Sequence, residues 1–565
     1  MPKTAVGETI VQSEQRKLIR RFKFIIVVTA FVFSILFIRV GQLMFFPKKS
    51  ITNNPETSHY RERGFIMDRN GEKLALSLET YSVYARPQEI EQKKTTAVQL
   101  GSVLETSYSN LLALLLKRAP FVWLARQVDL KYTGTLESLD MKGVYLEKEY
   151  KRYYPYGGLA AHLIGFSGID NRGLEGIEYY LDDFLLPKRE DNRGIDFSNY
   201  TRGYSVVLTI DRYLQEIVEE EISRAQVETG SRQVTAIVIE PETGEILALG
   251  NSPGYDLNNF VRYSSSIKRN KAITDSFEPG STFKIFIAAA LMDNGLINEK
   301  ESFDCRGKIE VQDVTIHDTG VHGRINFAQV LEKSCNVGMV SAVKKIDSVS
   351  LYEKLRDFGF GTPTGINLPG EARGILRNPS EWSGVSKYEI AIGQEISATP
   401  LQLVTAASAL ANGGILMQPS IIKRIERPDG TVFKSYPPLK VRTVLEKKTS
   451  ERILSILTGV LTDRGTGSKA HLDGYVIGGK TGTAQIADTQ KGGYLKGQFY
   501  ASFIGFMPVP NPKIVVLVTL DQPKGEVYGG GQTAAPVFRA IAERIAPYLN
   551  ILPSFSEVYL VENNE

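Results

Sequence analysis

A serine and a lysine one helical turn apart form the first reactive pair in the sequence. Ser281 follows Pro279-Gly280, and Lys284 stands three positions later, at the start of an apolar run that predicts a helix. This spacing places both side chains on one face, at a helix N-terminus that favours negative charge on oxygen. The helix is apolar on nearly every side, so we expect it to be buried. Burial should lower the pKa of Lys284, whose neutral amine is then the base for Ser281 as nucleophile.

The same four-residue spacing recurs at Ser265 and Lys268, in a polar stretch with no apolar helix behind it. Such a short pattern arises by chance in a chain of this length. We therefore expect a loop at this second pair. The apolar context, and not the spacing alone, distinguishes Ser281.

Two further polar clusters follow in the chain. Ser334-Cys335-Asn336 closes a helical pattern at 327–333, and Lys480-Thr481-Gly482-Thr483 lies in an expected strand after Gly478-Gly479. Taken singly, such residues more often cap helices or cover strand surfaces. Their occurrence together and in this order favours an acyl-transfer enzyme.

Each polar side chain has a role in that chemistry. Ser334 would relay a proton towards the leaving amine, and Asn336 would hydrogen-bond the amide backbone of the substrate. Lys480 would add positive potential. The hydroxyls of Thr481 and Thr483 would bind a terminal carboxylate.

The backbone around these residues completes the predicted site. The N–H groups of Ser281 and Thr483 would form an oxyanion hole, in which each donor contributes roughly 10²–10³ in rate. Gly482 lies between the two threonines and is assigned with them to substrate binding.

The elements that must position these groups follow an α+β pattern. Apolar runs joined by turn residues predict strands, and longer apolar patterns between the strands predict helices. Hairpin-joined strands with helices inserted between them favour an antiparallel sheet flanked by helices. We expect strands at 205–211, 234–240, 245–250, 475–486, 500–506 and 514–520, and helices at 283–294 and 400–412.

The N-terminus predicts a membrane anchor. Residues 24–46 are apolar over about the length of a bilayer, and lysines and arginines precede them. The positive-inside rule then places residues 1–23 in the cytoplasm as a tail and the bulk of the chain outside. No small-residue cleavage site follows, so we expect the anchor to remain. Arg39 and Gln42 share a helical face and either reach the headgroups or meet a partner helix.

The rest of the chain divides into two parts by composition. Residues 47–204, here called the pedestal, mix short strands with a helical stretch at 91–128 and hold no reactive pair. We expect an elongated α/β domain there, a catalytic domain at 205–550 and a flexible tail at 551–565.

Several other classes of protein are disfavoured. The net charge of +4 over 565 residues, without a basic stripe, gives no sign of nucleic-acid binding. Two cysteines, Cys305 and Cys335, allow neither a disulfide framework nor a four-cysteine zinc site. We expect two separate buried thiols, with one bridge as the alternative. His317-Asp318 with His322 fits no common ligand spacing, so we expect a loop, no metal and no cofactor.

One stretch formally matches a phosphate-binding loop. Residues 474–481 fit GxxxxGK[ST], and 515–521 resemble the acidic strand that usually follows. The wildcard positions hold the strand formers Tyr, Val and Ile, and Gly482 follows where a helix should begin. We therefore expect a strand here.

Together these motifs resemble the active-serine penicillin-recognising enzymes. Along nearly all of its length after the anchor, the chain is similar to the class B penicillin-binding proteins. The further strings that carry this resemblance are Arg63-Gly64, Asp68-Arg69-Asn70-Gly71, Arg152-Tyr153-Tyr154-Pro155, 173–178, 208–211, 411–414 and 534–538. The strings at 161–166 and 173–178 are most similar to septal, cell-division transpeptidases, with elongation-type transpeptidases as the alternative.

The resemblance implies a peptidoglycan D,D-transpeptidase that acts on stem peptides ending in D-Ala-D-Ala. The donor would lose D-Ala, a neighbouring stem peptide would supply the acceptor amine, and β-lactams would acylate Ser281. The implied partners are a polytopic membrane glycosyltransferase and other cell-division proteins at the bacterial cytoplasmic membrane. Residues 205–550 would be the transpeptidase domain and the pedestal a dimerisation-type domain that does not bind penicillin.

Some alternatives and departures stay open. A carboxypeptidase or a β-lactamase would share the serine chemistry, and a non-catalytic β-lactam sensor or scaffold is a candidate from another class. Cys335 stands where the family usually has Ser, and Glu395 where it usually has Gly.

Overall fold

The computed structural model describes residues 61–186, 202–488 and 491–554, with scattered residues of a helix between 23 and 37. The chain divides into two compact units, Met1–Tyr60 and Arg61–Glu565. Most of the predicted tail and anchor at 1–46, and the predicted tail after 554, lie outside the described residues. Among the residues described, no helix combines the length and the apolar character needed to cross a bilayer.

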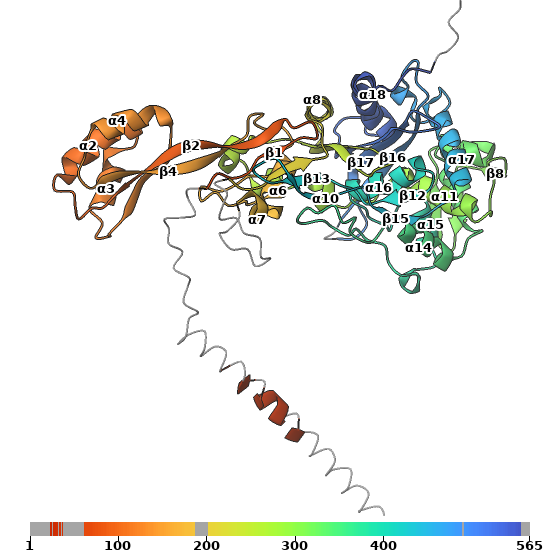
Figure 1. Ribbon diagram of the computed structural model, residues 1–565. Coiled ribbons are helices and arrows are strands. Elements are labelled where there is room, and N and C mark those ends of the chain that lie inside the picture. Colours follow the sequence, from red (N-terminus) through yellow and green to blue (C-terminus); the bar gives the residue numbers. More distant parts are fainter. Residues whose placement is uncertain are drawn as a thin grey trace, which may run out of the picture. The chain divides into compact units, whose positions relative to one another are not determined.

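A seven-stranded sheet underlies the first part of the second unit (Figure 1). Its strand order is β14-β13-β5-β1-β2-β3, and β4 also pairs with β2. The strands are β1 (Ile66–Met67), β2 (Lys73–Ala85), β3 (Val122–Val128), β4 (Val144–Tyr153), β5 (Ser205–Leu208), β13 (Ile422–Glu426) and β14 (Val432–Ser435). Only β1 and β5 pair in parallel. Strands β5, β13 and β14 follow residue 204, so the sheet crosses the predicted boundary between the pedestal and the catalytic domain. The position of that boundary stays a prediction.

Three helices cover the end of this sheet that holds β3 and β4, namely α2 (Lys93–Leu104), α3 (Tyr108–Leu115) and α4 (Thr133–Ser138). Leu100 and Leu111 pack with Val83 of β2 in a separate small core. The helical prediction for 91–128 is wrong after residue 115, because 122–128 forms β3. Its valines and tryptophan favour a strand.

A buried ionic cluster fixes the base of the pedestal. Glu178 lies in α6 (Gly176–Tyr180) and binds Arg63 Nε at 2.5 Å and Arg152 Nε at 2.6 Å. The side chains of Arg63 and Glu178 are fully buried. Short helices α5 (Ala161–Ile164) and α7 (Asp182–Leu185) flank α6 in the chain. Three of the strings that carry the family resemblance therefore meet in one ion cluster.

A five-stranded antiparallel sheet organises the second part of the unit, in the order β16-β17-β18-β6-β7. Its strands are β6 (Gln233–Ile239), β7 (Ile246–Ser252), β16 (Gly478–Ala487), β17 (Tyr494–Met507) and β18 (Ile514–Asp521). Every residue of β18 is buried, so both faces of the sheet are covered. The predicted antiparallel α+β arrangement is confirmed.

Helices supply the two covers (Figure 1). Helices α8 (Arg212–Thr229) and α18 (Gly530–Tyr548) contact each other and the sheet, and α16 (Pro400–Ala411) and α17 (Lys447–Thr458) form another contacting pair. Helix α11 (Lys284–Asp293) contacts α17 and is buried from Lys284 to Met292. The remaining helices are α9 (Ser265–Lys268), α10 (Lys271–Thr274), α12 (Phe327–Glu332), α13 (Asn336–Val343), α14 (Ser348–Asp357) and α15 (Ser386–Ala391).

Three small two-stranded sheets complete the unit. They pair β8 (Ser302–Cys305) with β11 (Gly323–Asn326), β9 (Lys308–Val311) with β10 (Val314–His317), and β12 (Ile415–Met417) with β15 (Lys440–Thr443). His317 ends a strand, so the predicted loop starts only at Asp318. The loop predicted at Ser265–Lys268 is also wrong, because the stretch forms the single-turn helix α9.

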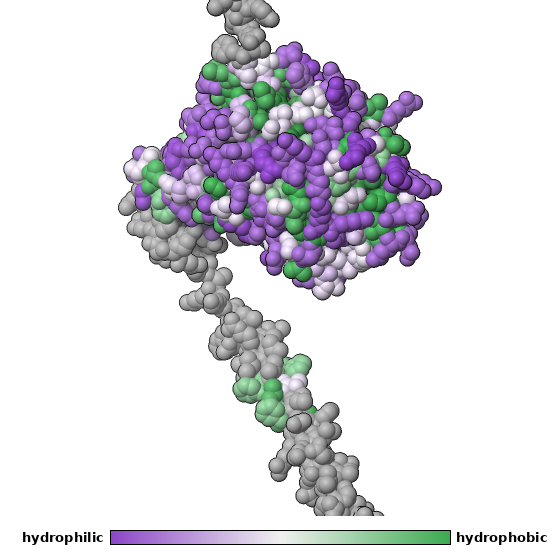
Figure 2. Space-filling view, turned by 90° about the vertical axis from the view of Figure 1, so that its right-hand side faces the viewer, coloured by the Kyte–Doolittle hydropathy of each residue, from purple (hydrophilic) through white to green (hydrophobic). Residues whose placement is uncertain are grey.

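The apolar residues of the second part lie mainly inside. Helix α16 is buried from Pro400 to Leu410, and α13 is buried at six of its eight positions. Figure 2 shows one face on which hydrophilic side chains predominate, with smaller apolar areas between them. Lys284, Lys480 and Thr481 of the predicted site are therefore exceptions within an apolar interior.

Candidate active site

Ser281 lies in a turn that precedes the central helix. Residues Gly280–Phe283 form a 3-10 turn that leads directly into α11. Gly280 has a φ of +56°, and a Cβ added there would lie 2.7 Å from the Thr483 carbonyl oxygen. Only a glycine allows this approach. The glycine thus holds the Ser281 turn against β16, next to the predicted oxyanion donor Thr483.

Lys284 begins α11 and is completely buried. Its Nζ donates to the Ser334 carbonyl oxygen at 2.5 Å and to Asn336 Oδ1 at 2.6 Å. Burial lowers the pKa of Lys284 to about 8, against the opposing influence of Asp318 and Cys335. The predicted lowering is confirmed. Among the described residues the Ser281 hydroxyl has no hydrogen-bond partner.

Ser334 lies between the two buried lysines. Its hydroxyl accepts a hydrogen bond from Lys480 Nζ at 2.8 Å and is 3.4 Å from Lys284 Nζ. Ser334 has a φ of +59°, a left-handed conformation that is uncommon for a residue with a side chain. This conformation lies between α12 and α13 and turns the chain sharply. The turn brings the second motif onto the first.

Lys480 is buried in the edge strand β16. Burial, followed by the charge of Lys284, lowers the pKa of Lys480 well below its ordinary value. Two ammonium groups around one hydroxyl without a carboxylate between them repel each other. A neutral amine at one of the two sites relieves that repulsion and leaves a base beside the nucleophile.

Asn336 contributes both ends of its amide. Its Oδ1 accepts from Lys284, and its Nδ2 donates to the His317 carbonyl oxygen at 2.9 Å. The side chain therefore joins the lysine to the end of β10. Its predicted contact with a substrate amide would require one of these bonds to be exchanged.

The Lys-Thr-Gly residues lie on β16 as predicted. Thr483 is exposed, and its Oγ1 accepts from the Gly530 N–H at 3.1 Å. Gly482 is buried, and a Cβ there would lie 2.4 Å from Ser502 Oγ and 2.8 Å from Thr282 Cγ2. A side chain at 482 would therefore separate β16 from the Ser281 turn. The mid-strand position of Lys480 is also incompatible with a phosphate-binding loop.

Thr466 is a neighbour that sequence reasoning missed. Its hydroxyl shares a 2.7 Å hydrogen bond with the Thr481 hydroxyl, which is buried. To bind a substrate carboxylate as predicted, the Thr481 hydroxyl would have to share or exchange its hydrogen bond with Thr466. The run Gly465-Thr466-Gly467 was the available signal, since glycines mark a close approach of the backbone.

Glu395 adopts the backbone conformation that a glycine takes without strain. Its φ is +55°, its N–H donates to Glu278 Oε1 at 3.0 Å, and its carboxylate accepts from Ser386 Oγ at 2.6 Å. Gly393, two residues earlier, accepts from the N–H of Gly280 at 3.0 Å. Glu395 therefore holds a left-handed conformation in the loop that supports the Ser281 turn.

The two cysteines are free and buried, but they are not separate. Ligand atoms of Cys305, Asp318, His322 and Cys335 lie within 4.8 Å of one another. The strand β8 and the Ser334 turn bring the two thiols to one place, which the sequence did not indicate.

Comparisons with known proteins agree with this geometry. Residues 234–543 match the penicillin-binding protein transpeptidase domain, and residues 58–190 match the penicillin-binding protein dimerisation domain. Stage V sporulation protein D of Bacillus subtilis is 33% identical, over 95% of this chain and 87% of its own length. Peptidoglycan D,D-transpeptidase FtsI of Buchnera aphidicola is 32% identical, over 87% of each.

A solved structure gives the same result in three dimensions. Penicillin-binding protein 3 of Mycobacterium tuberculosis, in complex with aztreonam, superimposes with a TM-score of 0.71 and 28% identity. The match covers 88% of this chain and 98% of that one. With the serine, the two lysines and the Lys-Thr-Gly strand assembled as described, the chain belongs to the class B penicillin-binding proteins.

Proposed function

We propose that the chain is a peptidoglycan D,D-transpeptidase that cross-links stem peptides through an acyl-enzyme at Ser281. The observation that carries this proposal is the Ser334 hydroxyl between Lys284 and Lys480, next to the turn that bears Ser281. Both lysines are fully buried and Ser334 is partly buried, so electrostatic and hydrogen-bond interactions among the three side chains are strong. The relatives named peptidoglycan D,D-transpeptidase support the same activity.

In the acylation step, Lys284 takes the proton of Ser281, and Oγ attacks the carbonyl carbon of the penultimate D-Ala. The N–H groups of Ser281 and Thr483 stabilise the negative oxygen of the tetrahedral intermediate. The amide C–N bond then breaks, and the Ser334 hydroxyl relays a proton to the departing D-Ala amine. An acceptor amine from a neighbouring stem peptide attacks the ester and releases Ser281. The hydroxyls of Thr481 and Thr483 bind the terminal carboxylate of the donor, and Lys480 adds positive potential.

The test is covalent labelling of the purified full-length chain by a fluorescent penicillin. Stable labelling that is lost in Ser281→Ala supports the proposal. Ser265→Ala is the matched control, because Ser265 has a lysine at the same spacing and should label normally. Rapid turnover of the label would indicate a β-lactamase instead. No labelling of the folded chain would indicate a non-catalytic scaffold.

A septal role is the second part of the proposal. It rests on the similarity of 161–166 and 173–178 to cell-division transpeptidases and on the relative named FtsI. Elongation-type synthesis is the alternative, and the sporulation relative adds a third role. A fluorescent fusion at mid-cell in dividing cells, with filaments on depletion, supports the septal role. Lateral-wall fluorescence, or a defect confined to spores, would refute it.

The membrane anchor at 24–46 and a polytopic glycosyltransferase partner are also proposed, on the sequence pattern alone. Removal of residues 1–46 should move the chain from the membrane fraction to the soluble fraction. Substitution of Arg39 and Gln42 by leucine should weaken co-purification with the glycosyltransferase while membrane attachment is kept. Loss of attachment in that double variant would show that the two residues act through the bilayer instead.

A further inference from the structure

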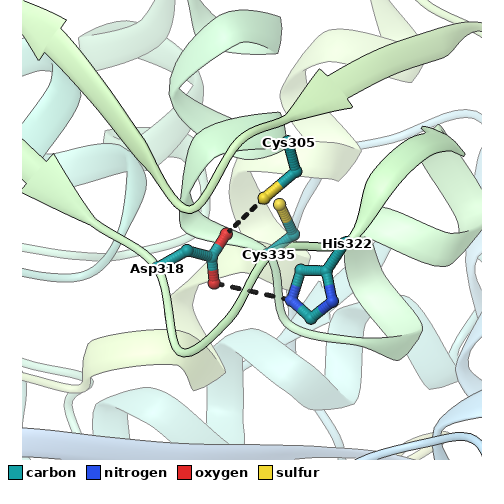
Figure 3. A group of neighbouring side chains, drawn as sticks. All are labelled: Cys305, Asp318, His322 and Cys335. Atoms are coloured by element: carbon teal, nitrogen blue, oxygen red, sulfur yellow. Dashed lines mark hydrogen bonds and ion pairs between the residues drawn. The ribbon is translucent and has the colours of Figure 1, made fainter.

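Four side chains of metal-ligand type converge beside the active site (Figure 3). Cys305 and Cys335 each present a sulfur, Asp318 a carboxylate and His322 an imidazole, and their ligand atoms all lie within 4.8 Å of one another. The side chains point towards a common centre from β8, from the 318–322 loop and from the start of α13. Such convergence of thiols, imidazole and carboxylate is not needed to fill an apolar core.

The chemistry of this set fits Zn²⁺. Zinc binds cysteine sulfur, histidine nitrogen and carboxylate oxygen, almost always as four ligands in a tetrahedron when the site is structural. With metal–ligand distances of about 2.0–2.3 Å, neighbouring ligand atoms of a tetrahedron lie about 3.3–3.8 Å apart. A contraction of about 1 Å from the largest separation present here would complete the site. Calcium and magnesium prefer oxygen ligands, and two sulfurs disfavour them.

The contacts already made are weak substitutes for a metal. Cys305 Sγ donates to Asp318 Oδ2 at 3.3 Å. His322 Nε2 is buried without a hydrogen bond among the described residues, and its ion-pair distance to Asp318 Oδ1 is 3.7 Å. That distance exceeds the reach of a normal hydrogen bond. A buried nitrogen without a partner is costly, and a cation at the common centre would satisfy it.

The fold supplies the ligands from rigid neighbours. Cys305 ends β8, which pairs with β11, and His322 directly precedes β11. Asp318 follows β10, and its Oδ2 also accepts from the Val337 N–H at 3.2 Å. Cys335 caps α13, accepting from the Gly338 N–H at 3.2 Å. These backbone bonds hold the carboxylate and one sulfur in place before any metal binds.

We propose that Cys305, Asp318, His322 and Cys335 form a structural Zn²⁺ site that fastens the 318–322 loop to the turn bearing Ser334 and Asn336. All four positions are filled by protein, so no open position remains for a reacting water. The ion would bind thiolates, and each thiol releases its proton to solvent on coordination. The site is independent of the proposed transpeptidase activity, because zinc binding is measured without substrate.

The site would act on catalysis only through position. Cys335 separates Ser334 from Asn336, and the His317 carbonyl that accepts from Asn336 immediately precedes Asp318. Fixing Cys335 and Asp318 to one ion therefore fixes both active-site side chains. The spacing of the ligands belongs to no common finger motif, which is why the sequence did not reveal them.

The main competing state is a disulfide between Cys305 and Cys335. It would use the same two sulfurs and exclude the metal, but it would leave His322 and Asp318 without a role. The two states are separable by mass, since a disulfide removes two hydrogens and blocks alkylation.

The test begins with the full-length chain purified in detergent without chelators and then equilibrated with ZnCl₂. Elemental analysis should give about one zinc per chain, and Co²⁺ substitution should give thiolate charge-transfer absorption with tetrahedral d–d bands. His322→Ala and Cys335→Ser should each weaken zinc binding by at least about tenfold. Cys335→Ser carries the residue usual in the family, so it should stay folded.

Matched controls use residues of the same type outside the cluster. His471 is exposed, and its imidazole pairs with Asp473 outside the cluster, so His471→Ala should keep its zinc. Asp313 lies in the β9–β10 turn, so Asp313→Asn should also keep its zinc. Asp318→Asn should lose its zinc. A chelator should lower the midpoint of thermal unfolding of the unmodified chain and leave that of Cys335→Ser unchanged.

Three results would overturn the proposal. If the folded chain binds no zinc while both thiols are alkylated without reductant, this result would show that the cluster is metal-free. A disulfide that persists after incubation with zinc would assign the sulfurs to a covalent bridge. If zinc binds but His322→Ala retains full affinity, the four-ligand site is also refuted.

Discussion

Lys480 Nζ donates a hydrogen bond of 2.8 Å to the Ser334 hydroxyl, which links the Lys-Thr-Gly strand to the second motif. The opposite side of the same hydroxyl faces Lys284, 3.4 Å away. The arrangement places a proton carrier between two amines whose pKa values burial lowers. Protons therefore have a short path between Lys284 and Lys480 through the Ser334 hydroxyl.

The first prediction concerns the pH dependence of acylation. Since burial lowers the pKa of Lys284 to about 8, its amine is protonated below that pH and neutral above it. The rate constant for acylation by benzylpenicillin should rise about tenfold per pH unit up to about 8 and then level off. Stopped-flow labelling between about pH 6 and pH 9.5 measures it. A flat profile below pH 8 would show that another group accepts the proton.

The second prediction separates the hydroxyl of Ser334 from its backbone. Ser334→Ala and Ser334→Gly both remove the proton relay and should slow acylation by about 10²–10⁴-fold. Glycine adopts the observed φ of +59° without strain, so the glycine variant should be more stable than the alanine variant by about 1 kcal/mol. Labelling kinetics and urea unfolding measure the two effects. Normal acylation in the glycine variant would eliminate Ser334 as the relay.

The third prediction tests the contact between β16 and the Ser281 turn. In Gly482→Ala the new methyl would meet Ser502 Oγ and Thr282 Cγ2, so β16 must move away from the nucleophile. A shift of about 1 Å in such a site lowers the rate by roughly 10²-fold. Penicillin labelling and the thermal unfolding midpoint should both fall.

Gly134→Ala is the control for that variant. Gly134 lies in α4, a Cβ there meets no atom within 4 Å, and the added methyl favours the helix. Its labelling should be unchanged and its stability equal or slightly higher. Equal behaviour of the two variants would mean that the space around Gly482 does not matter.

Local patterns account for what the sequence predicted correctly. The Ser281 turn, its buried lysine and the five strands of the second sheet follow from apolar runs and turn residues within short windows. The lowered pKa of Lys284 follows from the apolar helix that begins with it. The order of the three motifs limited the chemistry, and the fold then brought Lys284, Ser334 and Lys480 together.

Long-range contacts account for what the sequence did not reveal. Thr466 meets Thr481 through a separate turn, and Cys305 meets Cys335 because two small two-stranded sheets pack on α13. Strand β3 was predicted as helix since its surroundings are helical and its pairing with β2 lies far away in sequence. Sequence patterns report on residues that are close along the chain, whereas these features depend on residues that are close only in the folded structure.

The final prediction concerns the buried ions at the base of the pedestal. Burial opposes the Glu178 carboxylate, but the charges of Arg152 and Arg63 outweigh it and hold the pKa of Glu178 below its ordinary value. Glu178→Gln leaves two buried guanidinium groups without their shared carboxylate. The free energy of unfolding at neutral pH should fall by about 3–5 kcal/mol. Glu79→Gln, which breaks an exposed pair with Lys148, should change it by less than about 1 kcal/mol.

The lowered pKa of Glu178 also predicts how the stability of the protein changes with pH. A carboxylate whose pKa is lowered on folding stabilises the folded state above its unfolded pKa, and that stabilisation is lost as the pH falls through the folded value. The unmodified chain should therefore lose stability as the pH falls below about 4.5, the ordinary pKa of a glutamate. Glu178→Gln should lose less over the same range, because it has no charge left to neutralise. Equal acid sensitivity in the two chains, measured by urea unfolding, would show that Glu178 is not ionised in the folded protein.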